Sequence, residues 1–245
     1  MAFAHLSGIF PRSEELIAAS RAFERGRLDA DSLRLQAEEE ARRLVALQEE
    51  WGFDYVTDGL LRWQDLLRPL ADELPGVHAG PVTRWFDNNS FYRRPVIEQR
   101  LQPVGDAALR WTVREPLAGR PWKAILPTPW AFAALSEDQA YGDTDALLHD
   151  TAEVLRAEAA GLAAAGCLYI QFSDPVLVTA PSDGGVPRAQ RALGRRESER
   201  KYSSIWVRKP AGTSSEPESE SGWSSPCAFF RRLNSKFFSF SSAFA

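Results

Sequence analysis

The chain has 245 residues, of which 44% are hydrophobic, and a formal net charge of −4. This length is enough for one large α/β domain or two small ones, and the slightly acidic balance gives no general attraction to nucleic acid or to an anionic membrane. The N-terminal stretch lacks a basic segment followed by a long apolar run, and no window approaches the roughly 20 apolar residues of a membrane helix. We therefore expect a cytoplasmic protein with neither nucleic acid nor a membrane as its partner.

The N-terminal part alternates between short apolar stretches and segments whose apolar residues lie three or four positions apart. The second spacing puts apolar residues on one face of a helix, whereas the short stretches are typical of strands. Pro11, Gly26 and Gly52 mark the ends of elements. These signals predict a strand over residues 3–10, a helix over 13–25, a helix from a cap at Asp31 or Ser32 to Trp51, and a strand over 53–57.

The same alternation continues to about residue 178. Residues 84–95 and 108–116 are predicted to be irregular or hairpin-like excursions. The further elements are a strand over 123–127, a helix that is capped by Thr144 or Asp145 and ends at Gly166, and a strand over 168–178. Strands that alternate with helices of this length predict a parallel sheet with crossover connections.

The composition changes near Gly194. Residues 1–194 contain 8 serines, whereas residues 195–245 contain 13, together with 9 Lys and Arg against 5 Asp and Glu. Neither a helical nor a strand period persists in the second part. We predict one regular domain over 1–190 and a Ser- and Phe-rich tail over 191–245 that is disordered or non-native, with a frameshift or truncation favoured over a functional interaction tail.

Candidate site residues follow from the places where the predicted strands end, because the working residues of a parallel α/β barrel gather at the carboxyl ends of its strands. Asp58 and Asp174 suit acid–base chemistry or the binding of an amine, but an Asp at such a position also commonly caps the next turn. Arg12 and Arg62 suit the two-pronged binding of a carboxylate or phosphate, or a structural salt bridge. Ser173 precedes Asp174 at the end of the last strand. No residue is singled out as catalytic.

The residues give little direct support to a metal site. The three histidines show no ligand spacing relative to one another or to the two cysteines, Cys167 and Cys227. Cys167 opens an apolar strand, where a core side chain is the more common role. The many tryptophans suit either the lining of a pocket or, more commonly, core packing. No metal ligands are therefore predicted.

Five stretches together resemble a known family: "SGIFPRSEEL", "LVALQEEWGFDYVTDGLLRWQDLL", "RWFDNNSFYRRPVI", "KAILPTPWAFAALSED" and "GCLYIQFSDPVLV". They occur in the order seen in cobalamin-independent methionine synthases, and most closely in single-domain relatives that correspond to the catalytic C-terminal domain. The resemblance runs from about residue 3 to 178. It implies an incomplete (β/α)₈ TIM barrel. It also implies transfer of a methyl group from a methyltetrahydrofolate-type donor to homocysteine or a related thiol, in methionine biosynthesis.

Several positions depart from the family pattern. Leu60 stands where the family has the glutamate of Asp-Gly-Glu, which holds the amino group of homocysteine. Ile9 replaces a serine that touches the amino acid, and Ser173 replaces an aspartate that also binds the amino group. An apolar side chain cannot replace a carboxylate that faces an ammonium group. The substrate therefore differs, or the activity is impaired.

The resemblance also implies a zinc ion that binds the thiol and makes it a thiolate, the competent nucleophile. The family holds this zinc with a His-x-Cys pair, a glutamate and a later cysteine, all after the strand over 168–178. Here no histidine follows His149, so the ligands are missing from this chain. The alternative hypothesis is a non-catalytic half-barrel that works as a binding or association module. The sequence leaves the oligomeric state open.

Overall fold

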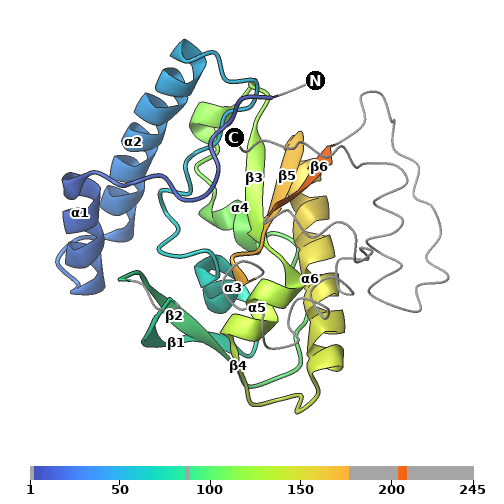
Figure 1. Cartoon of the computed structure of the whole chain (residues 1–245). Coiled ribbons are helices and arrows are strands. Elements are labelled where there is room, and N and C mark those ends of the chain that lie inside the picture. Colours follow the sequence, from blue (N-terminus) through green and yellow to red (C-terminus); the bar gives the residue numbers. More distant parts are fainter. Residues whose placement is uncertain (1–2, 86–88, 177–203, 209–245) are drawn as a thin grey trace.

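The computed structural model describes residues 3–85 and 89–176, together with the backbone of residues 204–208 (Figure 1). The described elements follow one another in a mixed α/β order. They are α1 (Glu14–Glu24), α2 (Ala30–Glu50), α3 (Arg68–Glu73), β1 (Val77–Arg84), β2 (Phe91–Ile97), α4 (Ala107–Trp111), the 3₁₀ helix η1 (Glu115–Leu117), β3 (Lys123–Pro127), α5 (Pro129–Leu135), β4 (Glu137–Asp138), α6 (Thr144–Ala164), β5 (Tyr169–Ser173) and β6 (Ser204–Arg208).

The long helices form where the apolar spacing predicts them, and each begins at a side-chain cap. Ser13 caps α1 by accepting a hydrogen bond from the Leu16 N–H at 3.1 Å. The caps of the other two long helices lie earlier than predicted: Asp29 caps α2 and Asp143 caps α6. In both places the sequence offers several Asp, Ser or Thr residues in a row, so spacing alone does not select among them.

The central sheet is built on two parallel strands. β3 pairs with β5 in parallel register, and β6 pairs with the other edge of β5 in the antiparallel direction. On the free edge of β3, the predicted strand over 53–57 is reduced to one parallel bridge between Val56 and Trp122. The long helix α6 leads from the β3–α5 unit back to β5, which is the predicted crossover (Figure 1). The parallel α/β arrangement is thus confirmed, while β6 departs from an all-parallel order.

The predicted strand over 3–10 is wrong. Its backbone touches the neighbouring segment only near its ends, where Ala4 and Asp54 exchange hydrogen bonds and the Phe10 N–H donates to the Gly59 carbonyl. Gly8 has a φ of 82°, in the left-handed region, which interrupts an extended strand between these contacts.

A second three-stranded sheet lies below the central one in Figure 1. β1 and β2 form an antiparallel hairpin, and β4 pairs with β2 in parallel. The hairpin-like prediction for 84–95 is confirmed for the residues described on either side of 86–88. The stretch 108–116 is instead helical, since α4 and η1 cover most of it.

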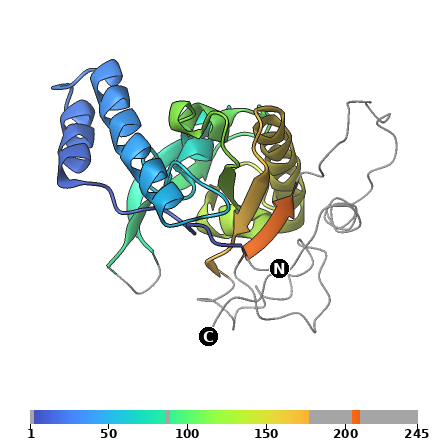
Figure 2. The ribbon, with the colours of Figure 1, turned by 90° about the horizontal axis from the view of Figure 1, so that it is seen from above.

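Helix α6 packs closely against the loop before α4. The buried Glu158 accepts hydrogen bonds from the N–H groups of Gly105 and Ala108, each at 2.9 Å. A Cβ added at Gly161 would lie 1.8 Å from the Gly105 carbonyl oxygen, so glycine is required for this contact. The view from above shows α6 along one side of the central sheet, with the pair α1 and α2 on the other (Figure 2).

Most of the core is one large cluster of apolar side chains around β3, β5 and the helices that cover them, and a smaller cluster lies between α1 and α2. Trp63 and Trp122 belong to it, which is the core role considered for the tryptophans, whereas Trp51 is exposed. In the part of the chain that the structure describes, no helix is long and apolar enough to cross a membrane. The boundary predicted at residue 190 and, apart from the backbone of β6, the tail over 191–245 lie outside the described residues.

Candidate functional site

The carboxyl ends of β3 and β5 lie side by side because the two strands are parallel and in register. The Thr128 N–H donates to the Ser173 carbonyl at 3.1 Å. The Thr128 hydroxyl caps α5 by accepting from the Ala131 N–H, and it donates to Asp174 Oδ2 at 2.5 Å. Asp174 is buried and Ser173 is half-buried. The structure therefore brings two of the predicted site residues, Ser173 and Asp174, to one edge beside Thr128.

Asp58 follows the segment that pairs with β3, and both of its carboxylate oxygens are engaged. Oδ1 accepts from the Leu60 N–H at 3.0 Å, and Oδ2 accepts from the Val113 N–H at 2.8 Å, 55 residues along the chain. Burial raises the pKa of this carboxyl, while the two N–H donors act in the opposite direction. Asp58 thus fixes a tight turn, which is the capping role considered from the sequence.

The turn that Asp58 fixes contains a strained residue. Leu60 has a φ of 53° and is the one non-glycine residue with positive φ in the described ranges. A left-handed backbone costs a non-glycine residue roughly 1–2 kcal/mol, and the contacts of the buried Leu60 side chain offset this cost. Its side chain offers no hydrogen-bond acceptor to an ammonium group.

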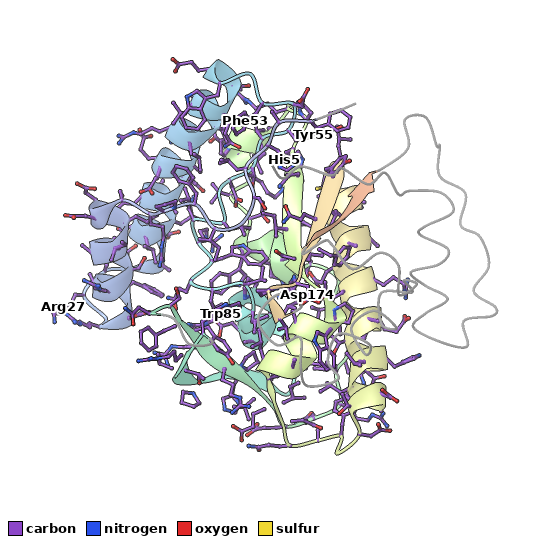
Figure 3. All side chains as sticks on the ribbon, in the orientation of Figure 1. His5, Arg27, Phe53, Tyr55, Trp85 and Asp174 are labelled. Atoms are coloured by element: carbon purple, nitrogen blue, oxygen red, sulfur yellow. The ribbon has the colours of Figure 1, made fainter. Side chains whose placement is uncertain are left out.

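The hairpin is anchored to this end of the sheet by a second buried carboxylate. Asp65 accepts from the Leu67 N–H at 2.9 Å and from the Arg93 N–H of β2 at 3.1 Å, and burial raises the pKa of its carboxyl. At the tip side of the hairpin, the Trp85 and Tyr92 rings meet edge to face with centroids 5.0 Å apart. Figure 3 shows Trp85 at the same end of the central sheet as Asp174, opposite His5 and Tyr55.

The two predicted arginines lie at different places. Arg12 is half-buried and sits two residues after Phe10, whose N–H binds the Gly59 carbonyl of the Asp58 turn. Arg62 lies in a cavity of about 450 Å³ between α2, α4 and η1, and its Nη1 donates to the Arg110 carbonyl at 2.8 Å. Arg12 thus lies close to the Asp58 turn, whereas Arg62 belongs to a separate cavity.

A buried amine that was not predicted from the sequence lies at the opposite end of β3. Lys123 is 1% exposed, and its Nζ donates to the Leu6 carbonyl and to Gln171 Oε1 at 2.8 Å, with His5 Nδ1 at 3.3 Å. Burial lowers the pKa of Lys123 to about 7. The sequence signal that could have indicated this buried amine is a lysine at the start of an otherwise apolar five-residue strand. This amine ties the N-terminal segment, including Ser7 through Gln171 Nε2, to the sheet.

The metal-binding residue types are dispersed in the described ranges, where no three His, Cys, Asp or Glu side chains gather as a metal site. Cys167 Sγ lies 3.0 Å from the Tyr169 carbonyl oxygen, at the amino end of β5 and away from Asp174, and burial raises the pKa of its thiol to about 12. His78 lies beside Glu98 and His149 beside Asp150, both on the surface. This donor set does not fit a zinc ion that activates a thiol as the thiolate.

Comparison with known proteins decides the family. The model of the cobalamin-independent synthase catalytic domain matches residues 4–193. The chain belongs to this family. It is 29% identical over 178 residues to a 5-methyltetrahydropteroyltriglutamate–homocysteine methyltransferase of Streptomyces griseus and 25% identical to that of Mycobacterium tuberculosis. These matches cover 69% of this chain but 22% and 23% of the two relatives.

A solved structure supports the fold of the cobalamin-independent synthase family. The B12-independent methionine synthase of Shewanella sp. W3-18-1, in complex with selenomethionine, superimposes with a TM-score of 0.53 at 22% identity. The superposition covers 67% of this chain and 50% of that structure. The match of the family model includes every predicted site residue, from Arg12 to Asp174.

Proposed function

We propose that this chain is an S-methyltransferase of the methionine synthase type, which transfers a methyl group from a methyltetrahydrofolate-type donor to the thiol of homocysteine or a related compound. The observation that carries the proposal is the match of the catalytic-domain model over residues 4–193, which spans the edge formed by β3, β5 and the Asp58 turn. The described elements then correspond to the first part of a (β/α)₈ barrel, with its chemistry at the carboxyl ends of the strands.

Within this proposal, Asp174 and Ser173 face the substrate. Asp174 follows β5, and the hydroxyl of Thr128 donates to Oδ2 at 2.5 Å, which orients the carboxyl group. A carboxylate held in this way suits the ammonium group of an amino acid. Ser173 adds a hydroxyl where the family has an aspartate, so the charge that meets the substrate amine is smaller than in the relatives.

Asp58 and Arg12 take supporting roles in the same proposal. Asp58 already accepts two backbone N–H groups, so it acts as a positioning residue that shapes the turn at Leu60 rather than as a ligand of the substrate. Arg12 lies next to this turn and, among the described residues, its side chain makes no hydrogen bond or ion pair. Its guanidinium is suited to the substrate carboxylate.

The chemistry that zinc supplies in this reaction, deprotonation of the thiol, needs ligands that the described residues do not provide. Since no histidine follows His149 in this chain, we propose that such ligands come from a partner chain. Elemental analysis of the purified chain, with and without added zinc, tests this point. Stoichiometric zinc that is lost on Cys167→Ser would show that the described residues hold the metal after all.

A second function is favoured by Leu60 and Ser173, which remove the carboxylates that the relatives offer to an amino acid. A chain with this edge would bind a ligand without turning it over. Methyl-transfer assays with homocysteine and with simpler thiols separate the two proposals. Turnover supports the enzyme, whereas binding of a thiol without turnover in excess zinc supports the binding module.

A further inference from the structure

The cavity that contains Arg62 is rich in arginine. It has a volume of about 450 Å³, within the range of small-molecule sites, and lies between α2, α4 and η1. Four arginines line it, and they come from three separate stretches of the sequence. They are Arg34, Arg62, Arg110 and Arg114.

Two of these arginines are neutralised by neighbouring carboxylates. Arg34 Nη1 lies 2.7 Å from Glu38 Oε1. Arg110 Nη1 lies 2.6 Å from Glu73 Oε2, and its Nη2 lies 2.8 Å from Asp106 Oδ1. Three carboxylates line the cavity: Glu38, Asp106 and Glu115. Glu115 Oε2 lies 2.8 Å from Arg42 Nε. Every carboxylate that lines the cavity therefore already has an arginine partner.

Arg62 and Arg114 are the two remaining cations. Within the described ranges no carboxylate oxygen lies within 4 Å of either guanidinium, and the hydrogen bond of Arg62 is to the neutral Arg110 carbonyl. Asp58, Glu38 and Glu73 attract Arg62 without contact. The two oxygens of Asp58 accept from backbone N–H groups. Arg62 is thus a partly desolvated cation with no counter-ion in contact.

A partly desolvated guanidinium gains most from an oxyanion that can accept two parallel N–H donors. We propose that this cavity is a binding site for a small oxyanion, either a carboxylate or a phosphate group, held by Arg62 with Arg114 at the rim. The site is separate from the edge at Asp174 and does not depend on methyl transfer. It requires no metal and no further chain.

Isothermal titration of the full chain with inorganic phosphate and, separately, with glutarate tests the proposal at constant ionic strength. We expect saturable binding of at least one probe, and the probe that binds more tightly distinguishes phosphate from carboxylate. Arg62→Gln should weaken binding at least tenfold, and Arg62→Lys should weaken it less because the charge remains. The matched control is Arg27→Gln, which changes an exposed arginine after α1 that does not line the cavity (labelled in Figure 3); it should bind as the wild type does.

The proposal is overturned if neither probe binds the wild type, or if Arg62→Gln binds as tightly as Arg27→Gln. Thermal melting of each variant without ligand shows whether it is folded. If Arg62→Gln does not fold, the exposed Arg114 decides: Arg114→Gln should weaken binding a few-fold, and unchanged affinity would contradict the assignment of the site.

Discussion

The buried amine of Lys123 predicts an unusual dependence of stability on pH. Lys123→Met removes the titrating group and keeps a side chain of similar length. The neighbouring groups do not titrate in the folded protein between pH 7 and 10, since the pKa of His5 is lowered to about 4 and that of the Cys167 thiol is raised to about 12. Lys123 is therefore the group in this cluster whose proton uptake differs between wild type and variant.

The sign and size of the effect follow from the pKa of Lys123, which burial lowers from 10.5 to about 7. Between these values the unfolded chain binds a proton that the folded chain does not, so stability rises with pH over this window. Below pH 7 both states are protonated and the folded state carries the full cost of the buried charge. At about 1.4 kcal/mol per pH unit the upper bound is roughly 5 kcal/mol, and the acceptors around Nζ reduce it, so we expect about 2–4 kcal/mol.

The measurement is urea unfolding of wild type and Lys123→Met at pH 6, 7, 8, 9 and 10. From pH 7 upward, the free energy of unfolding of the wild type should rise relative to that of the variant. Below pH 7 the difference between the two proteins should be constant. Ile125→Met, a buried change in the same strand without a titrating group, should differ from the wild type by a constant amount. Parallel curves for wild type and Lys123→Met across the whole range would refute the depressed pKa.

Two further predictions concern the packing of α6 on the loop before α4, and both are measured by urea unfolding. Gly161→Ala would normally stabilise a helix by about 1 kcal/mol, but here the new Cβ meets the Gly105 carbonyl oxygen at 1.8 Å, so we expect a loss of about 2 kcal/mol. Ala160→Gly, on the exposed face, should lose only about 1 kcal/mol through helix propensity, and a stabilising Gly161→Ala would contradict the close contact. Glu158→Ala removes the acceptor of two N–H groups and should cost about 3 kcal/mol, whereas a loss below about 1 kcal/mol would show that water replaces the carboxylate.

Local signals in the sequence predicted much of the fold. These signals are the start of α1 near Ser13, the spacing of apolar residues along α2 and α6, and the short apolar runs of β3 and β5. Each reflects interactions between residues close in sequence. The family resemblance, carried by motifs over residues 3–178, is confirmed by the family model. These features could be predicted from the sequence because each depends on a local pattern.

The errors arose where partners distant in sequence decide the structure. The segment over 3–10 is apolar enough for a strand, but the left-handed Gly8 breaks it, and its carbonyl at Leu6 binds the Lys123 amine instead of a neighbouring strand. For Asp58 the sequence left open both substrate binding and the capping of a turn, and its place in the substrate site stays a prediction. Its occupation by the Val113 N–H depends on a residue that no spacing rule connects to it.

The candidate site divides in the same way. Ser173 and Asp174 could be predicted as site residues because they end a strand. The structure adds Thr128, which becomes their neighbour only through the parallel register of β3 and β5. Arg12 and Arg62 were predicted together as anion ligands, yet only the fold shows that Arg62 joins three other arginines in a separate cavity. A site whose residues come from distant stretches of the sequence can be recognised only from the tertiary structure.

The central claim is that the edge at Asp174 serves methyl transfer, and one assay tests it most directly. Methylated thiol is quantified after incubation of the full chain with a methyltetrahydropteroyl glutamate donor, homocysteine and excess zinc, for the wild type, Asp174→Asn and the exposed control Asp145→Asn. We predict turnover by the wild type and the control, and a loss of at least tenfold in kcat/KM for Asp174→Asn. Absence of turnover in the wild type, or equal rates for all three proteins, would contradict the account.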